Sequence, residues 1–211
     1  QGLGDTLQFC RYVPMLAKLG AKVIFEVQKP LLALMKGIEG VASMTTTGIE
    51  PAEPYDCYCP LMSLPHAFKT TLDTIPSTIP YIPSDQEKTE YWANKLGKKD
   101  KLRIGLVWSG GFRPDQPEVW ATNNRRNLPL EKLIAFRDID ADFYSLQKGD
   151  PAESELVEVQ KNGWDGPNII NYTGELNDFT DTAALIENLD LVIAVDTSTA
   201  HLAAALGKPT W

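Results

Sequence analysis

The sequence has little of what three common kinds of protein require. No apolar run is long enough to cross a bilayer, so no transmembrane segment is predicted. Asp and Glu outnumber Lys and Arg by 28 to 20, and the net charge of −8 argues against general nucleic-acid binding, which needs a basic surface. Only two histidines are present, His66 and His201, too few to assemble a zinc site on sequence grounds. We therefore expect no membrane span, no nucleic-acid partner and no metal.

The cysteines are also few. Cys10, Cys57 and Cys59 are odd in number, and Cys57-Tyr58-Cys59 lacks the spacing of a zinc knuckle or a redox pair. They are typical of thiols kept reduced, which predicts a cytoplasmic protein. No basic stretch followed by an apolar one opens the chain, so no signal peptide is visible. The chain begins without Met, inside a motif, and stops at Trp211 where a strand is expected, so we expect a fragment truncated at both ends.

Apolar periodicity predicts helices that alternate with strands along the whole chain. In the first part we expect a helix, a strand, a helix, a short strand and a helix at residues 6–19, 22–27, 30–36, 55–60 and 85–96. In the second part we expect strands at residues 102–108, 143–147, 169–170 and 189–195, and helices at 129–136, 180–188 and 200–206. Such alternation predicts an α/β protein with parallel sheets and right-handed crossovers. A boundary between residues 85 and 100 would give two doubly wound domains, residues 1–90 and 91–211.

Two finer features accompany these elements. The first helix is amphipathic, and Leu7, Tyr12, Leu16 and Leu19 are the candidates for its buried side. The helix at 85–96 is expected to begin at Ser84-Asp85, with Glu87 placed for a capping box.

The most informative stretch is the strand at 189–195, which runs into the polar turn Asp196-Thr197-Ser198-Thr199 and then a small-residue helix that contains His201. Such a turn directs backbone N–H groups and the positive end of a helix dipole to one point, which suits an anion such as phosphate. His201 has two interpretations, a core histidine bonded to nearby backbone or a ligand of that anion. The position after the turn favours the ligand.

Other loops should meet this turn, because the carboxyl ends of parallel strands lie at one edge of a sheet. Ser109 and Gly110 follow the strand at 102–108, and Lys148 follows the strand at 143–147. Arg125 and Arg126 precede the helix at 129–136 and could reach the same cleft. Arginine and lysine both bind phosphate, so these residues are candidates for an anion site.

The chain opens on Gly2-Leu3-Gly4-Asp5, immediately before a helix. One interpretation is a tight turn with Asp5 as the N-cap. The other makes Asp5 a general base that faces the cleft between two domains, where it would deprotonate a hydroxyl. The acidic run Asp138-Ile139-Asp140-Ala141-Asp142 lies at the wrong end of its strand for the ligand, so metal binding is not expected there.

Two of these motifs carry a family resemblance. Gly2-Leu3-Gly4-Asp5-Thr6-Leu7 at the head of a helix and Asp196-Thr197-Ser198-Thr199-Ala200-His201-Leu202-Ala203 near the end together resemble glycosyltransferase family 9, the ADP-heptose:lipopolysaccharide heptosyltransferases. The segment Arg125-Arg126-Asn127-Leu128-Pro129-Leu130 is similar to the family-9-like domains that follow tetratricopeptide repeats in bacterial proteins. The resemblance extends over nearly the whole chain, and the motif near the end is its specific part.

The resemblance implies a GT-B fold, in which two Rossmann-like domains face each other, with the acceptor at the first and the nucleotide sugar at the second. It implies an inverting, metal-independent transfer to an envelope glycan or a protein, with no cofactor beyond the nucleotide-diphosphate sugar. Carried over by position, Asp5 is the base and Gly2 and Gly4 belong to the acceptor-side loop. On the donor side the resemblance implies that Asp196, Thr197, Ser198 and His201 form the diphosphate loop and that Arg125 or Arg126 stabilises the leaving diphosphate, with Lys148 a candidate for the nucleotide side. The strand-end argument adds Ser109, Gly110 and Thr199 to this donor side.

The family pattern is broken at Ser198-Thr199, where Gly-Pro or a similar pair usually stands, so the donor sugar and the acceptor stay undetermined. Two alternatives are open: a catalytically degenerate domain that serves as a binding or scaffold module, and a nucleotide-sugar 2-epimerase, for which no set of carboxylates beyond Asp5 is evident. Peripheral membrane association and tetratricopeptide repeats in a longer parent chain are further expectations.

Overall fold

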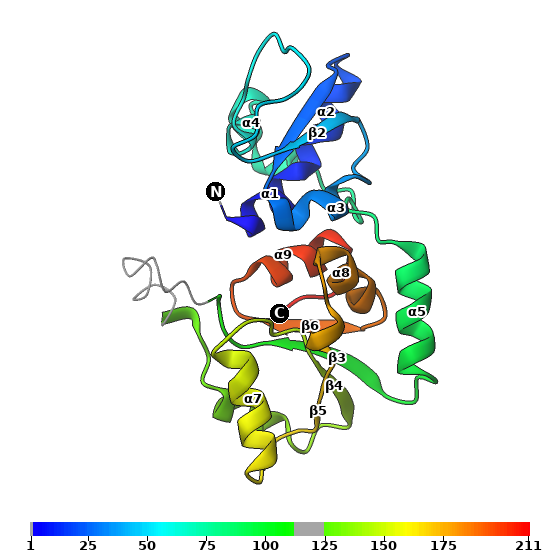
Figure 1. Ribbon diagram of the computed structural model, residues 1–211, viewed down its shortest axis with the longest axis vertical. Coiled ribbons are helices and arrows are strands. Elements are labelled where there is room, and N and C mark those ends of the chain that lie inside the picture. The colour runs from blue at the N-terminus through cyan, green and yellow to red at the C-terminus, as the bar shows by residue number, and fades with distance from the viewer. Residues whose placement is uncertain (1, 112–124) are drawn as a thin grey trace.

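The computed structural model describes residues 2–111 and 125–211. Figure 1 shows two α/β parts stacked along the long axis of the molecule. We call them the first half, from α1 to the 3-10 helix η4, and the second half, from α5 to α9. Among the described residues no helix combines the length and the hydropathy that a membrane span requires.

The first half is built on two parallel strands, β1 (Val23–Val27) and β2 (Val41–Thr46). The chain enters through α1 (Leu3–Phe9), passes through the 3-10 turn η1 (Cys10–Tyr12) and continues as α2 (Val13–Lys18) into β1. The connection from β1 to β2 consists of η2 (Lys29–Leu31) and α3 (Leu32–Met35). After β2 the chain is irregular, with three short helical pieces, η3 (Leu61–Ser63), α4 (Leu64–Ala67) and η4 (Leu72–Thr74).

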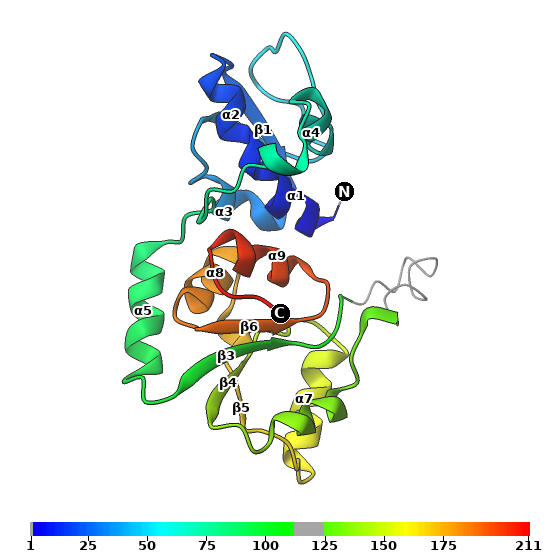
Figure 2. The same ribbon diagram turned by 180° about the vertical axis from the view of Figure 1, so that it is seen from behind.

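The second half contains a four-stranded parallel sheet in the order β5-β4-β3-β6. Its strands are β3 (Leu102–Val107), β4 (Ala141–Ser145), β5 (Ile169–Asn171) and β6 (Leu191–Ala194). Its helices are α5 (Gln86–Leu96), η6 (Leu130–Phe136), α7 (Ala152–Lys161), η7 (Thr173–Glu175), α8 (Phe179–Glu187) and α9 (Ser198–Ala205). Strands β3 and β6 pair in parallel and lie side by side in Figure 2. The strand order reverses between them. Ligands of parallel α/β sheets bind at such a reversal point.

The two faces of the second sheet bury different side chains, because successive residues of a strand point to opposite faces. Ile104 and Leu106 of β3 pack with residues of η6 and α7, among them Leu133 and Leu156. Val107 belongs instead to a core that includes α5, α8 and α9 and continues into the first half, where its members include Leu7, Val27 and Leu31. The two halves therefore share one continuous apolar core, and α1 packs directly on α9.

The prediction of an α/β protein with parallel sheets is confirmed, but several local predictions are wrong. Residues 55–60 form no strand and are exposed, and the strand that pairs with β1 is β2 instead. Leu19 is 76% exposed, because α2 ends at Lys18. The N-cap of α5 is Asp85, whose carboxylate accepts the N–H of Lys88 at 3.0 Å. Glu87 is therefore the second residue of the helix and cannot complete a capping box.

The division into residues 1–90 and 91–211 stays a prediction. It falls inside α5, and this helix packs against α8 of the second half.

Candidate functional site

Three strand-end loops of the second sheet open onto one cavity of about 360 Å³. The loop after β3 contributes Ser109 and Gly111, the loop after β4 contributes Lys148, and residues Thr197 to Thr199 follow β6. Pro30 reaches the same cavity from the first half, so both halves line it. The structure thus brings together the three loops that the sequence predicts to meet. Gly110, Arg125, Arg126, Asp196, His201 and Asp5 are not among the residues that line this cavity.

The N-terminus of α9 forms part of the cavity wall. The helix begins at Ser198 with Thr197 as its N-cap, two residues earlier than predicted, so Ser198 and Thr199 belong to its first turn and not to a preceding loop. The first-turn N–H groups of a helix lack intrahelical partners and carry partial positive charge. The Thr197 hydroxyl is buried and has no hydrogen-bond partner within the described residues. This end of α9 can therefore donate several hydrogen bonds to an anion in the cavity.

Asp196, just before the N-cap of α9, lies between the guanidinium of Arg126 and the imidazole of His201. One carboxylate oxygen lies 3.6 Å from Arg126 Nη1, and the other lies 3.8 Å from His201 Nε2. The Asp196 side chain is 74% exposed, so water weakens both attractions. The arrangement nevertheless gathers Arg126, Asp196 and His201 beside the first turn of α9.

Arg126 also contacts the loop after β3. A β-carbon on Gly110 would lie 3.4 Å from Arg126 Nε, and the backbone N–H of Gly110 donates to Asn127 Oδ1 at 2.8 Å. The structure therefore places Gly110 beside Arg126, and Asn127 holds the two segments together. Arg125 is exposed, whereas Arg126 is half-buried, so Arg126 is the better candidate for an anion ligand. Asn123 and Asn124, which precede them, lie outside the described residues.

Lys148 lines the cavity, but its ammonium group is already engaged. Lys148 Nζ donates to the backbone carbonyl of Thr173 at 2.7 Å. The same loop is fixed by Glu153, which accepts the Thr173 hydroxyl and, at 2.9 Å, the N–H of Gly149. Burial raises the pKa of Glu153, but these two hydrogen bonds and the nearby Lys148 charge outweigh it, so the pKa lies below its ordinary value. Glu153 therefore stays ionised and holds the Lys148 loop against η7.

Asp5 lies in the first turn of α1, across from α9. Gly2 is the N-cap of α1, so Gly4 and Asp5 are helical and Gly4 is not part of a loop, contrary to the prediction. Asp5 is the third helical residue and not the N-cap. Its Oδ2 accepts the N–H of Gly2 at 2.7 Å, and within the described residues its Oδ1 accepts no hydrogen bond. One carboxylate oxygen thus caps the helix, while the other is available to a ligand.

Gly4 brings Asp5 close to His201. A β-carbon on Gly4 would lie 2.6 Å from Cδ2 of the His201 ring, so the residue before Asp5 is in direct contact with the imidazole. Only glycine permits this approach without a shift of the ring. The turn that carries Asp5 is thus packed against the His201 side of α9.

Several features of the site were not predicted, namely the hydrogen bonds of Gln147, which lies in the predicted loop after β4, and the residues at the N-terminus of α8. Gln147 is buried, and its Oε1 accepts the backbone N–H groups of Trp108 at 3.2 Å and Ser109 at 2.9 Å, which fixes the loop after β3. Asn177, Asp178, Phe179 and Thr182 line the cavity at the N-terminus of α8. A fourth strand end, that of β5, leads to this segment, so the rule used for the other three loops could have found it.

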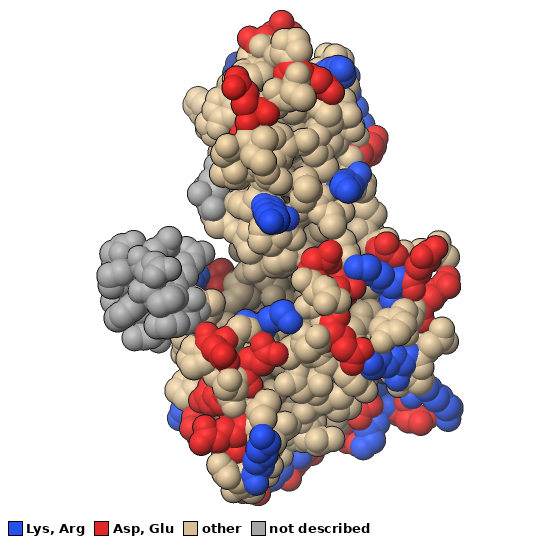
Figure 3. Space-filling model, in the orientation of Figure 1, with Lys and Arg blue, Asp and Glu red and all other residues tan. Residues whose placement is uncertain are grey.

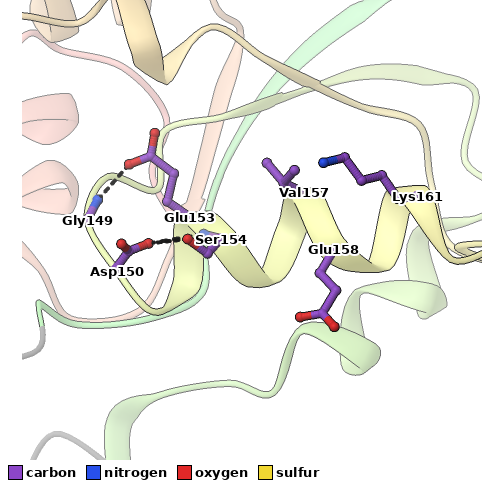
Figure 4. A pocket seen from close by; sticks show the side chains of 7 residues that line it. All are labelled: Gly149, Asp150, Glu153, Ser154, Val157, Glu158 and Lys161. Carbon is purple, nitrogen blue, oxygen red and sulfur yellow. Dashed lines mark hydrogen bonds between the residues drawn. The ribbon is translucent and has the colours of Figure 1, made fainter.

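A larger hollow of about 580 Å³ runs along α7, and Figure 4 shows its lining. Asp150, Glu153 and Glu158 give it an acidic character, with Lys161 at one end. Asp150 and Glu153 are already used, since they accept hydrogen bonds from Ser154 and Gly149. Figure 3 shows acidic side chains gathered over α7, which makes this hollow unsuitable for a phosphate.

Two carboxylates of the Asp-x-Asp run at 138–142 form ion pairs with basic side chains. Asp140 pairs with Lys101 at 2.6 Å and Asp138 with Arg137 at 3.6 Å. Nowhere in residues 2–111 and 125–211 do three His, Cys, Asp or Glu side chains form a group that could hold a metal ion.

Comparison with known structures supports the fold assignment. The E. coli ADP-heptose LPS heptosyltransferase II matches all of this chain over 81% of its own, at 12% identity and a TM-score of 0.62. A glycosyltransferase family 9 protein from Veillonella parvula DSM 2008 matches all of this chain over 78% of its own, at 13% identity and a TM-score of 0.66. E. coli heptosyltransferase WaaC with ADP-2-deoxy-2-fluoro heptose matches all of this chain over 85% of its own, at 14% identity and a TM-score of 0.56.

Identities this low show a shared fold alone. No curated protein matches the sequence. Residues 145–210, less than half of the chain, match the sequence model of glycosyltransferase family 9 (heptosyltransferase). This span contains Lys148 and the whole segment from Asp196 to His201, but neither Asp5 nor Arg126. The chain thus has a heptosyltransferase-like α/β fold, and its C-terminal part carries the sequence pattern of glycosyltransferase family 9.

Proposed function

We propose that this protein is an inverting, metal-independent glycosyltransferase that transfers a sugar from a nucleoside-diphosphate donor to a hydroxyl of a glycan or a protein. The observation that carries the proposal is the contact of Gly4 with His201, which joins the turn bearing Asp5 to the anion-binding end of α9. In this proposal the two halves act as the facing domains of a GT-B enzyme. The family match over residues 145–210 and the fold of the heptosyltransferases support it.

The donor diphosphate would lie at the N-terminus of α9. The first-turn N–H groups, the Thr197 hydroxyl and the Arg126 guanidinium would face its oxygens. Negative charge grows on the diphosphate as its bond to the sugar breaks, and donors already fixed in place stabilise that charge more than water does. Because Asp196 is itself anionic and lies near Arg126, its role would be to orient Arg126 and His201 and not to contact the phosphate.

Asp5 would act as the base. As the acceptor hydroxyl oxygen bonds to the anomeric carbon, Asp5 takes its proton, and the bond between that carbon and the diphosphate oxygen breaks with its electron pair on the diphosphate. Attack from the face opposite the leaving group inverts the configuration at the anomeric carbon. Oδ1 of Asp5, which accepts no hydrogen bond within residues 2–111 and 125–211, suits this step, since Oδ2 is held by the N–H of Gly2.

Thermal unfolding in the presence of ADP, UDP, GDP or CMP and of their sugar conjugates tests the donor site. A nucleotide at about 100 times its dissociation constant adds roughly 2.7 kcal/mol of stability. For a chain of this size the melting temperature should then rise by about 5 to 10 °C. His201→Ala should reduce the rise, whereas His66→Ala should not, because His66 is exposed in α4 of the first half.

The base is tested by Asp5→Asn, in which the amide oxygen can still accept the N–H of Gly2. We expect turnover to fall by about 10²- to 10⁴-fold with nucleotide binding unchanged. Asp56→Asn, in an exposed loop, serves as the matched control. No nucleotide-induced shift in a folded protein would favour the scaffold alternative. Conversion of a nucleotide sugar in the absence of any acceptor would favour the epimerase.

A further inference from the structure

Gln28, the residue immediately after β1, contacts the first turn of α1 at two points. Its Oε1 accepts the hydroxyl of Thr6 at 2.8 Å, and its Nε2 donates to the backbone carbonyl of Gly2 at 3.4 Å. Gly2 is the N-cap of α1 and Thr6 is its fourth residue, so the two contacts lie on either side of Asp5. These contacts join two segments that are far apart in sequence, since Gln28 lies 22 positions after Thr6.

These contacts involve the same turn that holds the Asp5 carboxylate. Asp5 Oδ2 is bonded to the N–H of Gly2, the same residue whose carbonyl Gln28 holds. Thr6 is only 3% exposed, so its hydroxyl needs a partner inside the protein, and Gln28 supplies it. The amide of Gln28 thus uses its acceptor on Thr6 and its donor on Gly2. Two such hydrogen bonds restrict the rotation of the first turn of α1 about the helix axis.

The same loop also reaches the donor cavity. Pro30, two residues after Gln28, is the residue of the first half that lines that cavity within the described residues. Pro30 stands at the start of η2, where its ring restricts the backbone. The loop after β1 therefore contacts the first turn of α1, which carries Asp5, and also lines the donor cavity.

We propose that Gln28 is a positioning residue for Asp5: its side-chain amide clamps the first turn of α1 through Thr6 and Gly2 and so sets the place of the Asp5 carboxylate at the site. The proposal rests on the proposed glycosyltransferase function, in which Asp5 is the base. Gln28 does not touch Asp5 in any contact described above, so it acts through the helix turn. A displacement of a reacting group by about 1 Å can cost roughly a hundredfold in rate.

Three substitutions test the clamp. Gln28→Leu removes both hydrogen bonds at similar size, and Thr6→Val removes the hydroxyl while keeping the shape. Gln28→Glu keeps an acceptor for the Thr6 hydroxyl but cannot donate to the carbonyl of Gly2, so it removes only one of the two hydrogen bonds. Gln8→Leu and Gln8→Glu are matched controls, since Gln8 is exposed on the same helix.

Two readouts are needed. The first is the NMR chemical shift of the Asp5 carboxyl carbon at a fixed pH, which requires no substrate: Gln28→Leu and Thr6→Val should change it, and Gln8→Leu should change it much less. The second is release of the nucleoside diphosphate from the sugar conjugate that raises the melting temperature of the wild type: Gln28→Leu and Thr6→Val should lower kcat about tenfold to a hundredfold, with little change in KM and in the nucleotide-induced thermal shift.

The outcomes separate this inference from the proposed function. Unchanged kcat and an unchanged Asp5 chemical shift in the Gln28 variants would overturn the positioning role even if the wild type is an active transferase. A fall in kcat that only follows a loss of folded protein, with no difference between Gln28→Leu and Gln28→Glu, would also overturn it. If the wild type binds none of the nucleotides and releases none from its sugar conjugate, the proposed function fails, while the chemical shift still decides whether Gln28 sets the position of the Asp5 carboxyl.

Discussion

The ring of His201 lies against the backbone of Gly4, so closely that a β-carbon on Gly4 would be 2.6 Å from Cδ2 and 3.1 Å from Nε2. This contact belongs to the packing of α1 on α9, the main helix contact between the two halves. It explains why glycine stands one residue before Asp5. A change in the His201 ring should therefore alter the packing of the turn that carries Asp5.

Gly4→Ala should therefore destabilise the protein. The added methyl overlaps the imidazole, and overpacking of this kind costs about 1–3 kcal/mol. Urea unfolding measures the loss, and Gly174→Ala is the control, because nothing lies within 4 Å of a β-carbon there. In a double variant, His201→Ala should recover most of the loss, since it removes the group that is struck. Additive effects of the two substitutions would contradict the contact.

Much of the site could be predicted because it depends on strand ends. Ser109, Lys148 and Thr197 each follow a buried apolar strand, and parallel strands present their carboxyl ends at one edge, so their meeting at one cavity follows from the sequence pattern. The contribution of Asn177 and Asp178 follows from the same rule applied to β5. That strand has only three residues, which made its end hard to recognise.

The rest of the site depends on contacts between residues far apart in sequence, which a local pattern does not contain. Gln147 Oε1 reaches Ser109 across 38 positions, and Gln28 reaches Thr6 across 22. The choice between Arg125 and Arg126 depends on which one the packing turns towards Gly110, and their sequence neighbourhood is nearly the same.

The misplaced strand in the first half has a similar cause. Tyr55 and Tyr58 have high β-propensity, yet they are 55% and 72% exposed, and no strand forms there. The segment that does pair with β1 runs from Val41 to Thr46 and contains small polar residues, so its alternation is weak. Pairing with a neighbouring strand, and not propensity, decided which segment became β2.

Arg103 offers a prediction about stability. Its side chain is 5% exposed, and its guanidinium donates to the carbonyls of Leu96 at 3.2 Å and Gly97 at 2.7 Å, at the C-terminal end of α5. Arg103→Met should leave these carbonyls without their partner and cost about 2 kcal/mol of unfolding free energy, measured by urea unfolding. Lys101→Met is the matched control.

Lys101 pairs with Asp140 at the surface, with its side chain 49% exposed, so its loss should change little. Equal losses in the two variants would contradict a specific role for Arg103 in fixing α5 to the sheet.

The three cysteines should differ in reactivity. Burial raises the pKa of the Cys10 thiol to about 12, whereas Cys57 and Cys59 are exposed in the loop before η3. The thiolate is the reactive form, so a thiol reagent at about pH 8 should modify two cysteines of the native protein and the third only after unfolding. A Cys10→Ala variant should lose the slow, unfolding-dependent reaction and keep the fast one. Fast modification of three thiols in the native state would contradict the burial of Cys10.

The pH dependence of stability should depend in part on Asp190, the half-buried residue just before β6. Burial raises the pKa of Asp190, but the N–H of Arg103 at 2.9 Å and the Lys99 ammonium at 2.5 Å outweigh it and hold the pKa below its ordinary value. A carboxyl whose pKa is lowered by folding stabilises the protein above its unfolded pKa, about 3.9, and this contribution is lost as the pH falls through the folded pKa. Unfolding free energy should therefore be nearly constant from about pH 7 to 5 and fall below that.

Asp190→Asn tests this assignment, because the amide cannot be ionised. The variant should be less stable than the wild type near neutral pH, and the difference should shrink as the pH falls through the lowered pKa of the wild-type carboxyl. Urea unfolding at three or more pH values measures the two curves, and Asp73→Asn, at an exposed position of η4, is the control. If the curves of Asp190→Asn and the wild type stay parallel down to the lowest pH, the contacts with Arg103 and Lys99 do not depend on the charge of Asp190. The acid sensitivity would then arise from the other carboxylates whose pKa is lowered, such as Asp178 at the N-cap of α8, where burial, which raises the pKa, is outweighed by hydrogen bonds from Thr180 and the N–H of Asp181.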